Sequence, residues 1–453
     1  MPSLVSRLTR LIPGGALISV TGLYLGVVLS FVLNIVTARI LGTTAFGHVA
    51  MGLALLNLLA VAAQGGLSQS SSRFIGEYLA RNDNAALRGF IRIAQWVPIL
   101  TGLTMAGVGL LVVNLWGFPS PVDSVVTVSL VSVPALGSLL LSQNIARGFG
   151  RMVLATLPVP VLLPAFALLS FAAGPYAPAD ATGFMIWYGA ITLTLMVSSL
   201  LFLVFSAHIK TEAGTPVRPS FHDRRRWLKV SWPMFVTALG QQFMRRADVL
   251  ILAVLVAPQT LGLYALGARF AQIVAVARYG VNRYSMPQIA RSFASGDLDH
   301  VASHGRHANR IVLLATSVVV VGLVVAGDPV LQYAGDIKGT AYVFMLILLA
   351  GQVAASFHSE ALQTLQMCGY ERTANGIVLI SVPLLFIIGS ITTAVFGAIG
   401  MAISVSLLTA WQFWFAAHNV RNFIGVDMSI WIRSRKPPGG TGESEESRPD
   451  QQR

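Results

Sequence analysis

The chain has 453 residues, of which 55% are hydrophobic and only 11% are Asp, Glu, Lys or Arg. Soluble domains carry about 25% of these charged residues, so the composition excludes a water-soluble fold. Basic residues outnumber acidic ones by 31 to 18, for a formal net charge of +13. In a soluble protein this surplus would indicate nucleic-acid binding, but the mean hydropathy of +0.70 indicates a membrane protein.

Long apolar runs without charge set the fold class. The runs 11–38 and 93–122 exceed the ~20 residues that a membrane-spanning helix needs. They do not alternate in polarity, which excludes an outer-membrane barrel. We predict an all-α polytopic membrane protein with about twelve spans, at residues 15–38, 45–68, 91–114, 124–145, 152–173, 184–206, 230–256, 260–283, 309–332, 340–366, 373–395 and 397–418.

The breaks between spans alternate between strongly basic and almost uncharged. Most of the 31 basic residues fall in one set, whereas the other set holds only Arg39 and Lys338. The positive-inside rule therefore predicts cytoplasmic termini, an uncleaved first helix and no nucleic-acid partner, because the surplus serves orientation and attraction to anionic membrane lipids. The tail 421–453 is expected to be cytoplasmic, and disordered from about residue 433.

The chain resembles itself at an offset of about 215 residues. Residues 43–52 align with 259–268 when Gly47 is set on Gly262, and residues 73–83 align with 288–297, with Tyr78 on Phe293. Two six-helix units have the same orientation, so we predict parallel repeats around a central cavity. The expected divisions are an N-terminal bundle at 1–206, a cytoplasmic linker at 207–229 and a C-terminal bundle at 230–420.

Charged residues within spans are costly and are functional candidates by default. The span 230–256 holds Arg245, Arg246 and Asp248, and the span 260–283 holds Arg269 and Arg278. Asp248 and Arg269 are predicted ~12 Å and ~14 Å below the outer membrane surface, so they can form an ion pair, which would be a purely structural role for both.

The surplus of arginine over carboxylate at this depth predicts water or an anionic ligand. A guanidinium group suits phosphate because it donates two parallel hydrogen bonds. Arg39 and Arg278 are further candidates, although each has a simpler interpretation as a side chain that extends to the interface. Glu360, with His358 in the span 340–366, is either an interfacial carboxylate or a site for a proton or cation.

The segment 37–83 resembles the polysaccharide-transporter (Wzx-type) flippases of the multidrug/oligosaccharidyl-lipid/polysaccharide exporter superfamily. The resemblance rests on an A-R-x-L-G stretch, an aromatic-Gly turn, a Gly-Leu helix end and an R-F-x-x-E-Y-like helix, which here are Ala38, Arg39, Leu41, Gly42, Phe46, Gly47, Gly66, Leu67, Arg73, Phe74, Glu77 and Tyr78. One departure is that the first half has no basic residue deep in a span.

The resemblance implies a flippase that moves an undecaprenyl-diphosphate-linked oligosaccharide (a repeat unit of O-antigen, capsule or exopolysaccharide) across the bacterial inner membrane. It implies Arg245, Arg246, Arg269, Arg278 and Arg39 as diphosphate ligands, with Asp248 and Glu360 as ion-coupling residues. A polysaccharide polymerase and a chain-length regulator are implied partners.

Two other functions stay open at this point. A drug or small-metabolite cation antiporter would need carboxylates around an apolar cavity. A membrane enzyme would need a large external loop, and none is present. The sequence has no phosphate-binding P-loop and a single cysteine, Cys368, so we predict a protein that is not an enzyme and has no metal or cofactor.

Overall fold

The computed structural model describes residues 14–117, 119–209 and 219–428, and all regular secondary structure in these residues is helical. Both the tail beyond residue 428 and the linker residues 210–218 lie outside the described part, so the expected disorder of the tail is not tested. Eight of the described helices are long and apolar enough to cross a membrane, and a bent pair makes nine. The all-α polytopic fold is confirmed.

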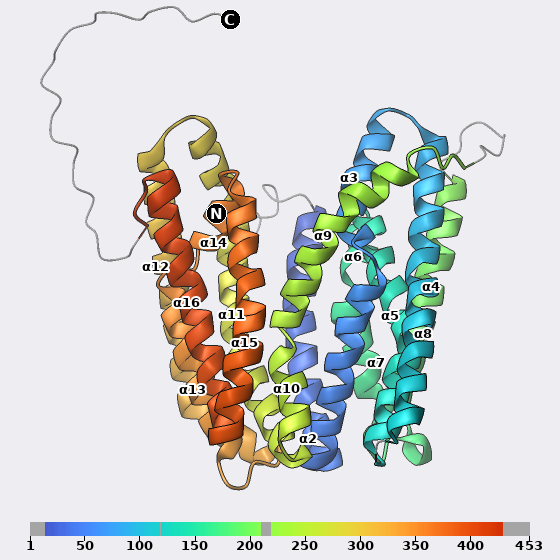
Figure 1. Ribbon diagram of the computed structural model, residues 1–453, viewed down its shortest axis with the longest axis vertical. Coiled ribbons are helices and arrows are strands. Elements are labelled where there is room, and N and C mark those ends of the chain that lie inside the picture. Colours follow the sequence, from blue (N-terminus) through green and yellow to red (C-terminus); the bar gives the residue numbers. More distant parts are fainter. Residues whose placement is uncertain (1–13, 118, 210–218, 429–453) are drawn as a thin grey trace, which may run out of the picture.

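The first half of the chain forms one bundle, shown in blue to light green in Figure 1. Its helices are α2 (Gly14–Ala63), α3 (Leu67–Ala80), α4 (Asn84–Trp116), α5 (Val122–Gly148), α6 (Met152–Thr156), the π-helix η1 (Pro158–Leu162), α7 (Leu163–Ser170), the 3-10 turn η2 (Gly174–Tyr176) and α8 (Ala181–Ile209). We call the end of the molecule that carries α3 and the start of α4 the basic end.

The second half forms the other bundle, shown in green to red. Its helices are α9 (Arg224–Met244), α10 (Ala247–Leu255), α11 (Pro258–Ala294), α12 (Leu298–Tyr333), α13 (Thr340–Ser356), α14 (Ala361–Met367), α15 (Glu371–Phe396) and α16 (Ala398–Ile424). Like α2 in the first bundle, which begins at the basic end, α16 ends there (Figure 1).

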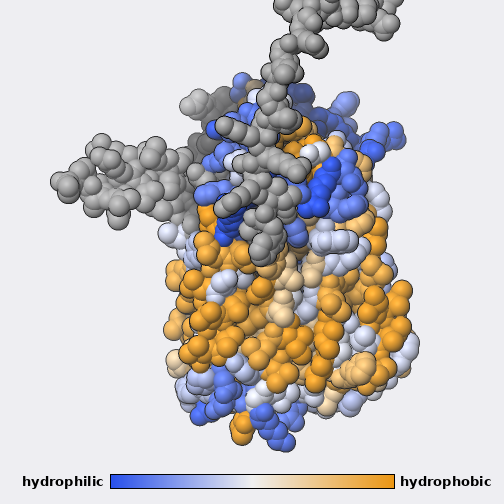
Figure 2. Space-filling view, turned by 90° about the vertical axis from the view of Figure 1, so that its left-hand side faces the viewer, coloured by the Kyte–Doolittle hydropathy of each residue, from blue (hydrophilic) through white to orange (hydrophobic). Residues whose placement is uncertain are grey.

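The outer surface is apolar over a broad band, as Figure 2 shows in orange between two more polar ends. Large aliphatic side chains face outward in this band, among them Leu103, Val318, Val325 and Ile391. Such a continuous apolar surface is unstable in water and matches the hydrocarbon core of a bilayer.

Several predicted spans have different boundaries in the structure. The spans 15–38 and 45–68 join in α2, whose backbone leaves the helical region at Gly42 (φ 81°, ψ 161°) and which ends at Ala63, before the separate helix α3. Pro158 and Pro160 fall in the span 152–173, which is divided into α6, η1 and α7, because proline removes a backbone donor.

Two predicted spans of the second half are broken helices. The span 230–256 is divided into α9 and α10 at Arg245 and Arg246, and the span 340–366 into α13 and α14, which are bent by 46°. Neither break contains a proline or glycine, so turn residues gave no sign of it. In each case a charged residue lies at the break, Arg246 in one and Glu360 in the other.

The two bundles pack together at the end opposite the basic end through the glycines that align in the repeat. Gly47 lies against the carbonyl of Pro258, and Gly262 lies against the carbonyl of Thr43. An added Cβ at either glycine would clash with that backbone, so the close crossing of α2 and α11 requires glycine at both positions. Phe46 and Ala50 of α2 are buried in the same apolar cluster as Leu261 of α11.

At the basic end, the start of α9 packs on the first bundle. Arg226 donates two hydrogen bonds of 2.8 Å to the Glu77 carboxylate, and Trp227 Nε1 donates to the Tyr78 hydroxyl at 2.6 Å. Farther along, α9 packs on α15 of the second bundle, so it runs between the two groups of helices (Figure 1). The helix α9 therefore joins the bundles at the basic end.

Candidate functional site

The charged residues of the predicted seventh span lie at a helix break. The helix α9 ends at Met244, Arg245 and Arg246 form a turn, and α10 begins at Ala247. Asp248 lies in the first turn of α10, where a carboxylate interacts favourably with the positive end of the helix dipole, and its Oδ1 accepts a hydrogen bond from the Val249 N–H at 2.8 Å. The break thus places three charged residues within four positions inside the membrane-spanning region.

Asp248 does not form the expected ion pair with Arg269. Its Oδ2 accepts a hydrogen bond of 2.9 Å from the hydroxyl of Tyr264, and the described residues contain no ion pair between Asp248 and Arg269. The prediction of a pair was wrong because α11 presents a buried tyrosine to this carboxylate. Asp248 is thereby fixed in the core of the second bundle.

Arg246 and Arg269 form a cationic cluster with a single carboxylate nearby. Their charges repel each other, and both interact electrostatically with Asp248. Arg269 Nη1 donates to Gln272 at 3.1 Å, whereas the Nε of Arg246 is buried without a hydrogen-bond partner in the described part of the chain. An unsatisfied guanidinium donor in a buried site costs free energy, which an anionic ligand or water would recover.

Tyr188 on α8 is a residue of the first bundle near this cluster, and it was not among the residues predicted from the sequence. The tyrosine is within range of an electrostatic interaction with both Arg246 and Arg269. A lone tyrosine in an apolar span is ordinarily a packing residue, and Tyr188 also packs on Phe184 within α8.

Arg245 lines a separate, polar cavity of about 130 Å³ between the first bundle and α9. The other polar side chains in its wall are Gln64, Ser68, Gln69, Asn144 and Gln241. Arg245 also donates to Gln242 at 3.2 Å and interacts electrostatically with Arg246. Because Arg245 in the cavity wall is next to Arg246 in the same turn, the cavity lies beside the cluster of Arg246 and Arg269.

The two remaining candidate arginines lie at aromatic rings. The guanidinium of Arg39 is 5.0 Å from the centroid of Tyr333, and that of Arg278 is 4.8 Å from the centroid of Phe413. Cation–π contacts of this kind stabilise a cation inside or near the membrane. The structure does not bring these two residues into the cluster, and their role as diphosphate ligands stays a prediction.

Glu360 lies in the break between α13 and α14 and has no exposed surface. Its Oε2 accepts a hydrogen bond of 2.6 Å from Ser285 on α11. The interfacial carboxylate considered from the sequence is therefore wrong, because the side chain points into the second bundle. In the described part of the chain no group of three or more His, Cys, Asp or Glu is placed to hold a metal ion.

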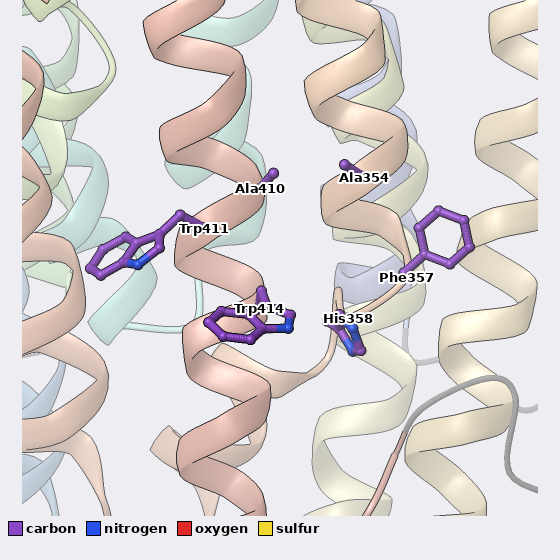
Figure 3. Close-up of a pocket in the computed structure, with 6 residues that line it drawn as sticks. All are labelled: Ala354, Phe357, His358, Ala410, Trp411 and Trp414. Carbon is purple, nitrogen blue, oxygen red and sulfur yellow. The ribbon is translucent and has the colours of Figure 1, made fainter. Parts of the chain in front are cut away.

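A cavity of about 410 Å³ lies on the second bundle between α13 and α16. Figure 3 shows His358 on one side and Trp414 on the other, with the small side chains of Ala354 and Ala410 above them. The lining is almost wholly apolar and aromatic, and Trp414 is largely exposed. Nothing in its lining is suited to bind a diphosphate.

The fold of two helical bundles is similar to that of solved transporters of the MOP superfamily. The chain aligns structurally with an inward-facing multidrug resistance MATE family transporter (TM-score 0.72, 13% identity, 88% of this chain and 96% of that chain). It also aligns with the lipid II flippase MurJ in an inward closed conformation (0.69, 14%, 88% and 87%) and with a MOP superfamily transporter from Pyrococcus furiosus (0.61, 14%, 89% and 95%).

The chain belongs to the family described as polysaccharide biosynthesis protein, whose profile matches residues 14–293. That match covers more than half of the sequence, and with it the whole first bundle and the cationic cluster. No curated protein matches the chain. Family and fold together identify a multi-pass membrane transporter.

Proposed function

We propose that this protein flips an oligosaccharide linked to undecaprenyl diphosphate from the cytoplasmic to the periplasmic leaflet of a bacterial inner membrane, with both termini cytoplasmic. The observation that carries the proposal is the uncompensated positive charge of Arg246 and Arg269 at the boundary of the bundles. The family's description as a polysaccharide biosynthesis protein supports a glycan cargo, and the flippase among the proteins of similar fold supports a lipid-linked one.

A diphosphate would supply the negative charge and the hydrogen-bond acceptors that the cluster of Arg246 and Arg269 lacks. It brings the negative charge that offsets the repulsion between the two guanidinium groups, and its oxygens accept hydrogen bonds in the paired geometry that arginine donates. The Nε of Arg246, which is buried and unsatisfied, then has an acceptor. Tyr188 of the first bundle is within electrostatic range of both arginines, so we propose it as a further polar group for the headgroup.

The helix break supports a cargo that must be released on the other side. Arg246 lies in the turn just before the short helix α10, which packs on α15 and α11 of the second bundle and on α2 of the first, whereas the start of α9 packs on α3 of the first bundle. A rocking of one bundle against the other would move Tyr188 relative to the arginines and change the affinity for the headgroup. We propose an ion gradient as the driving force, and a polysaccharide polymerase with its chain-length regulator as the next proteins to receive the product.

The same charge argues against a cationic drug as cargo. MATE transporters share the fold, but at 13% identity this likeness concerns architecture alone. A cation entering between Arg246 and Arg269 would meet two like charges, and the nearby carboxylate of Asp248 is occupied by Tyr264 and the Val249 N–H. An anionic headgroup is the cargo that this site favours.

The test is complementation in a strain that lacks the gene, with surface polysaccharide as the readout. Arg246→Ala and Arg269→Ala are expected to lower export about tenfold or more, because a charge-assisted hydrogen bond contributes about 1.5–3 kcal/mol; Arg245→Ala is expected to have a smaller effect. Arg372→Ala, at an exposed position in the first turn of α15, is the control that should export normally. Normal export by both the Arg246 and Arg269 variants would refute the site.

A further inference from the structure

The break between α13 and α14 buries Glu360 among polar groups from two other helices, α11 and α12. Ser285 Oγ donates to its Oε2 at 2.6 Å, and the Asn282 amide, with its nitrogen turned toward Glu360, donates to Oε1 at 2.6 Å and to the Arg278 carbonyl at 2.9 Å. The Glu360 N–H donates to Asn309 Oδ1 at 3.0 Å. The carboxyl group is thus held by α11, and the backbone of Glu360 is held by α12.

No cation compensates this carboxyl group within the described part of the chain. The ion pairs found there are formed by other carboxylates. A carboxylate buried without a counter-charge costs several kcal/mol, and the usual outcome is that it binds a proton. Two neutral donors, a hydroxyl and an amide, reduce this cost without supplying charge.

The charged and titratable groups on the surrounding elements are engaged elsewhere. On α12, Arg306 donates to the Asp427 carbonyl at 3.0 Å, and on α16, Arg421 pairs with the Asp427 carboxylate at 2.9 Å. His358 lies near that pair and interacts with both of its members. On α11, Arg278 lies over the Phe413 ring, and Cys368, after α14, is buried in the apolar cluster that contains Leu365.

A second buried carboxylate shows why Glu360 is different. Asp336 is 1% exposed, but it lies just before α13 and accepts hydrogen bonds from the backbone N–H groups of Thr340 (2.9 Å) and Tyr342 (3.1 Å). Helix N-termini interact favourably with a carboxylate, and Asp336 has this interaction in addition to its two backbone hydrogen bonds. The Glu360 side chain accepts no hydrogen bond from the N-terminus of α14.

The spacing around Glu360 suits a proton and not a metal ion. Cations such as Na⁺ and Ca²⁺ need oxygen ligands at roughly 2.3–2.6 Å, so two ligand atoms on either side of an ion must be well over 3 Å apart. The side-chain atoms of Ser285 and Asn282 lie directly at the two carboxyl oxygens, at hydrogen-bond distance. No space for an ion remains between them.

From this geometry we infer that Glu360 is a proton-binding site that couples proton movement to transport. The site is connected to the candidate anion site by α11, which carries Arg269, Asn282 and Ser285 and also crosses α2 at Gly262. Ionisation of Glu360 strengthens the bonds from Ser285 and Asn282, and protonation weakens them, so the proton alters how α11 is held in the second bundle. The inference rests on the proposed transport for its role in coupling, but not for proton binding itself.

Infrared difference spectroscopy on the purified full-length protein in nanodiscs tests proton binding directly. A pH step should produce a C=O band of a protonated buried carboxyl group that disappears in Glu360→Gln and persists in Asp336→Asn. Ser285→Ala should keep the band and shift its frequency, because one hydrogen bond to the group is lost. A spectrum of Glu360→Gln identical to that of the wild type, or no effect of Ser285→Ala on the band, would overturn the assignment.

Proteoliposomes containing a fluorescent undecaprenyl-diphosphate sugar test the coupling separately. A pH gradient should accelerate flipping by the wild type and by Asp336→Asn, whereas Glu360→Gln should lose this stimulation. Undiminished stimulation in Glu360→Gln would refute coupling at Glu360 and leave the proposed cargo intact. If the wild type does not flip the lipid at all, the proposed function fails, and the infrared band still decides whether Glu360 binds the proton.

Discussion

Each half of the chain contains a segment that follows its sixth span and lies against a glycine of its third span. In the first half the backbone of Ser220 packs on Gly89 of α4, and in the second half Met428 packs on Gly305 of α12. The first segment continues into α9 and so ties the first bundle to the second. In both halves such a segment covers a glycine near the start of the third span, while the different continuations make the basic end asymmetric.

The halves differ most in what their spans carry. Polar residues within the first bundle are neutral, such as Gln64 and Asn144, whereas the second bundle holds Arg246 and Glu360 at helix breaks and Arg269 within α11. The second half thus contains the proposed anion and proton sites. The first half contributes Tyr188, which is near the anion site. The two halves therefore share their helix packing, whereas the charged residues of the proposed sites lie in the second half alone.

The largest loss of stability is expected from a substitution where α9 packs on the first bundle. Trp227→Ala should lower the free energy of unfolding by about 3–5 kcal/mol, because Trp227 is fully buried against Phe90 and its indole donates to Tyr78. Met428→Ala, at the corresponding place of the second half, should cost about 2 kcal/mol. Denaturation in detergent measures both, with the exposed Trp232→Ala as a control within about 0.5 kcal/mol of the wild type. Equal losses at Trp227 and Met428 would contradict the asymmetry.

A symmetric effect is expected at the crossing of α2 and α11. Gly47→Ala and Gly262→Ala each place a methyl group on the backbone of the opposite bundle, and overpacking of this kind costs about 1–3 kcal/mol. Gly107→Ala in α4 meets no atom within 4 Å and serves as the control, expected to be neutral or stabilising. Thermal unfolding should show similar losses for the two crossing variants. A loss at one of them alone would indicate that the crossing is not a symmetric feature of the repeat.

The sequence predicted the all-α class and the aligned glycines, because these depend on residue type and on periodicity. It did not predict the two helix breaks, since neither contains the proline or glycine that ordinarily marks one. It also did not predict that Tyr264 would hold Asp248, or that Tyr188 would lie near the arginines. Those contacts join residues of different helices, and their partners are decided by how the helices pack.

The two halves also differ in how their stability is expected to respond to alkaline pH. Burial raises the pKa of Tyr78 to about 12, whereas the aligned position in the second half is Phe293, which cannot ionise. Because the folded pKa lies above the unfolded value near 10, stability from Tyr78 is complete below pH ~10 and is lost as the pH rises through about 12. Absorbance titration should show a late tyrosinate step that Tyr78→Phe removes. Ionisation of Tyr78 at the ordinary pH would show that its contacts with Trp227 and Asp223 do not persist in the membrane.

The smallest effects are expected at the aspartates that cap α4 and α12, which align in the repeat. Asp83 Oδ1 accepts from the Ala86 N–H at 2.9 Å and Asp297 Oδ1 from the His300 N–H at 2.9 Å, but only Asp297 also contacts the His300 ring, at 2.6 Å. Asp83→Ala should cost about 1 kcal/mol.

At Asp297 the His300 N–H, together with the ring, holds the pKa of the carboxyl group below its usual value. Its stabilising contribution is therefore present above pH ~4 and is lost as the pH falls through the lowered pKa. Hydrogen exchange of the His300 amide should accelerate on acidification relative to Asp297→Asn, in which the cap oxygen is kept and the charge is removed. An identical acid response of this variant and the wild type would show that the cap at α12 acts as a hydrogen-bond acceptor alone, as a neutral amide would.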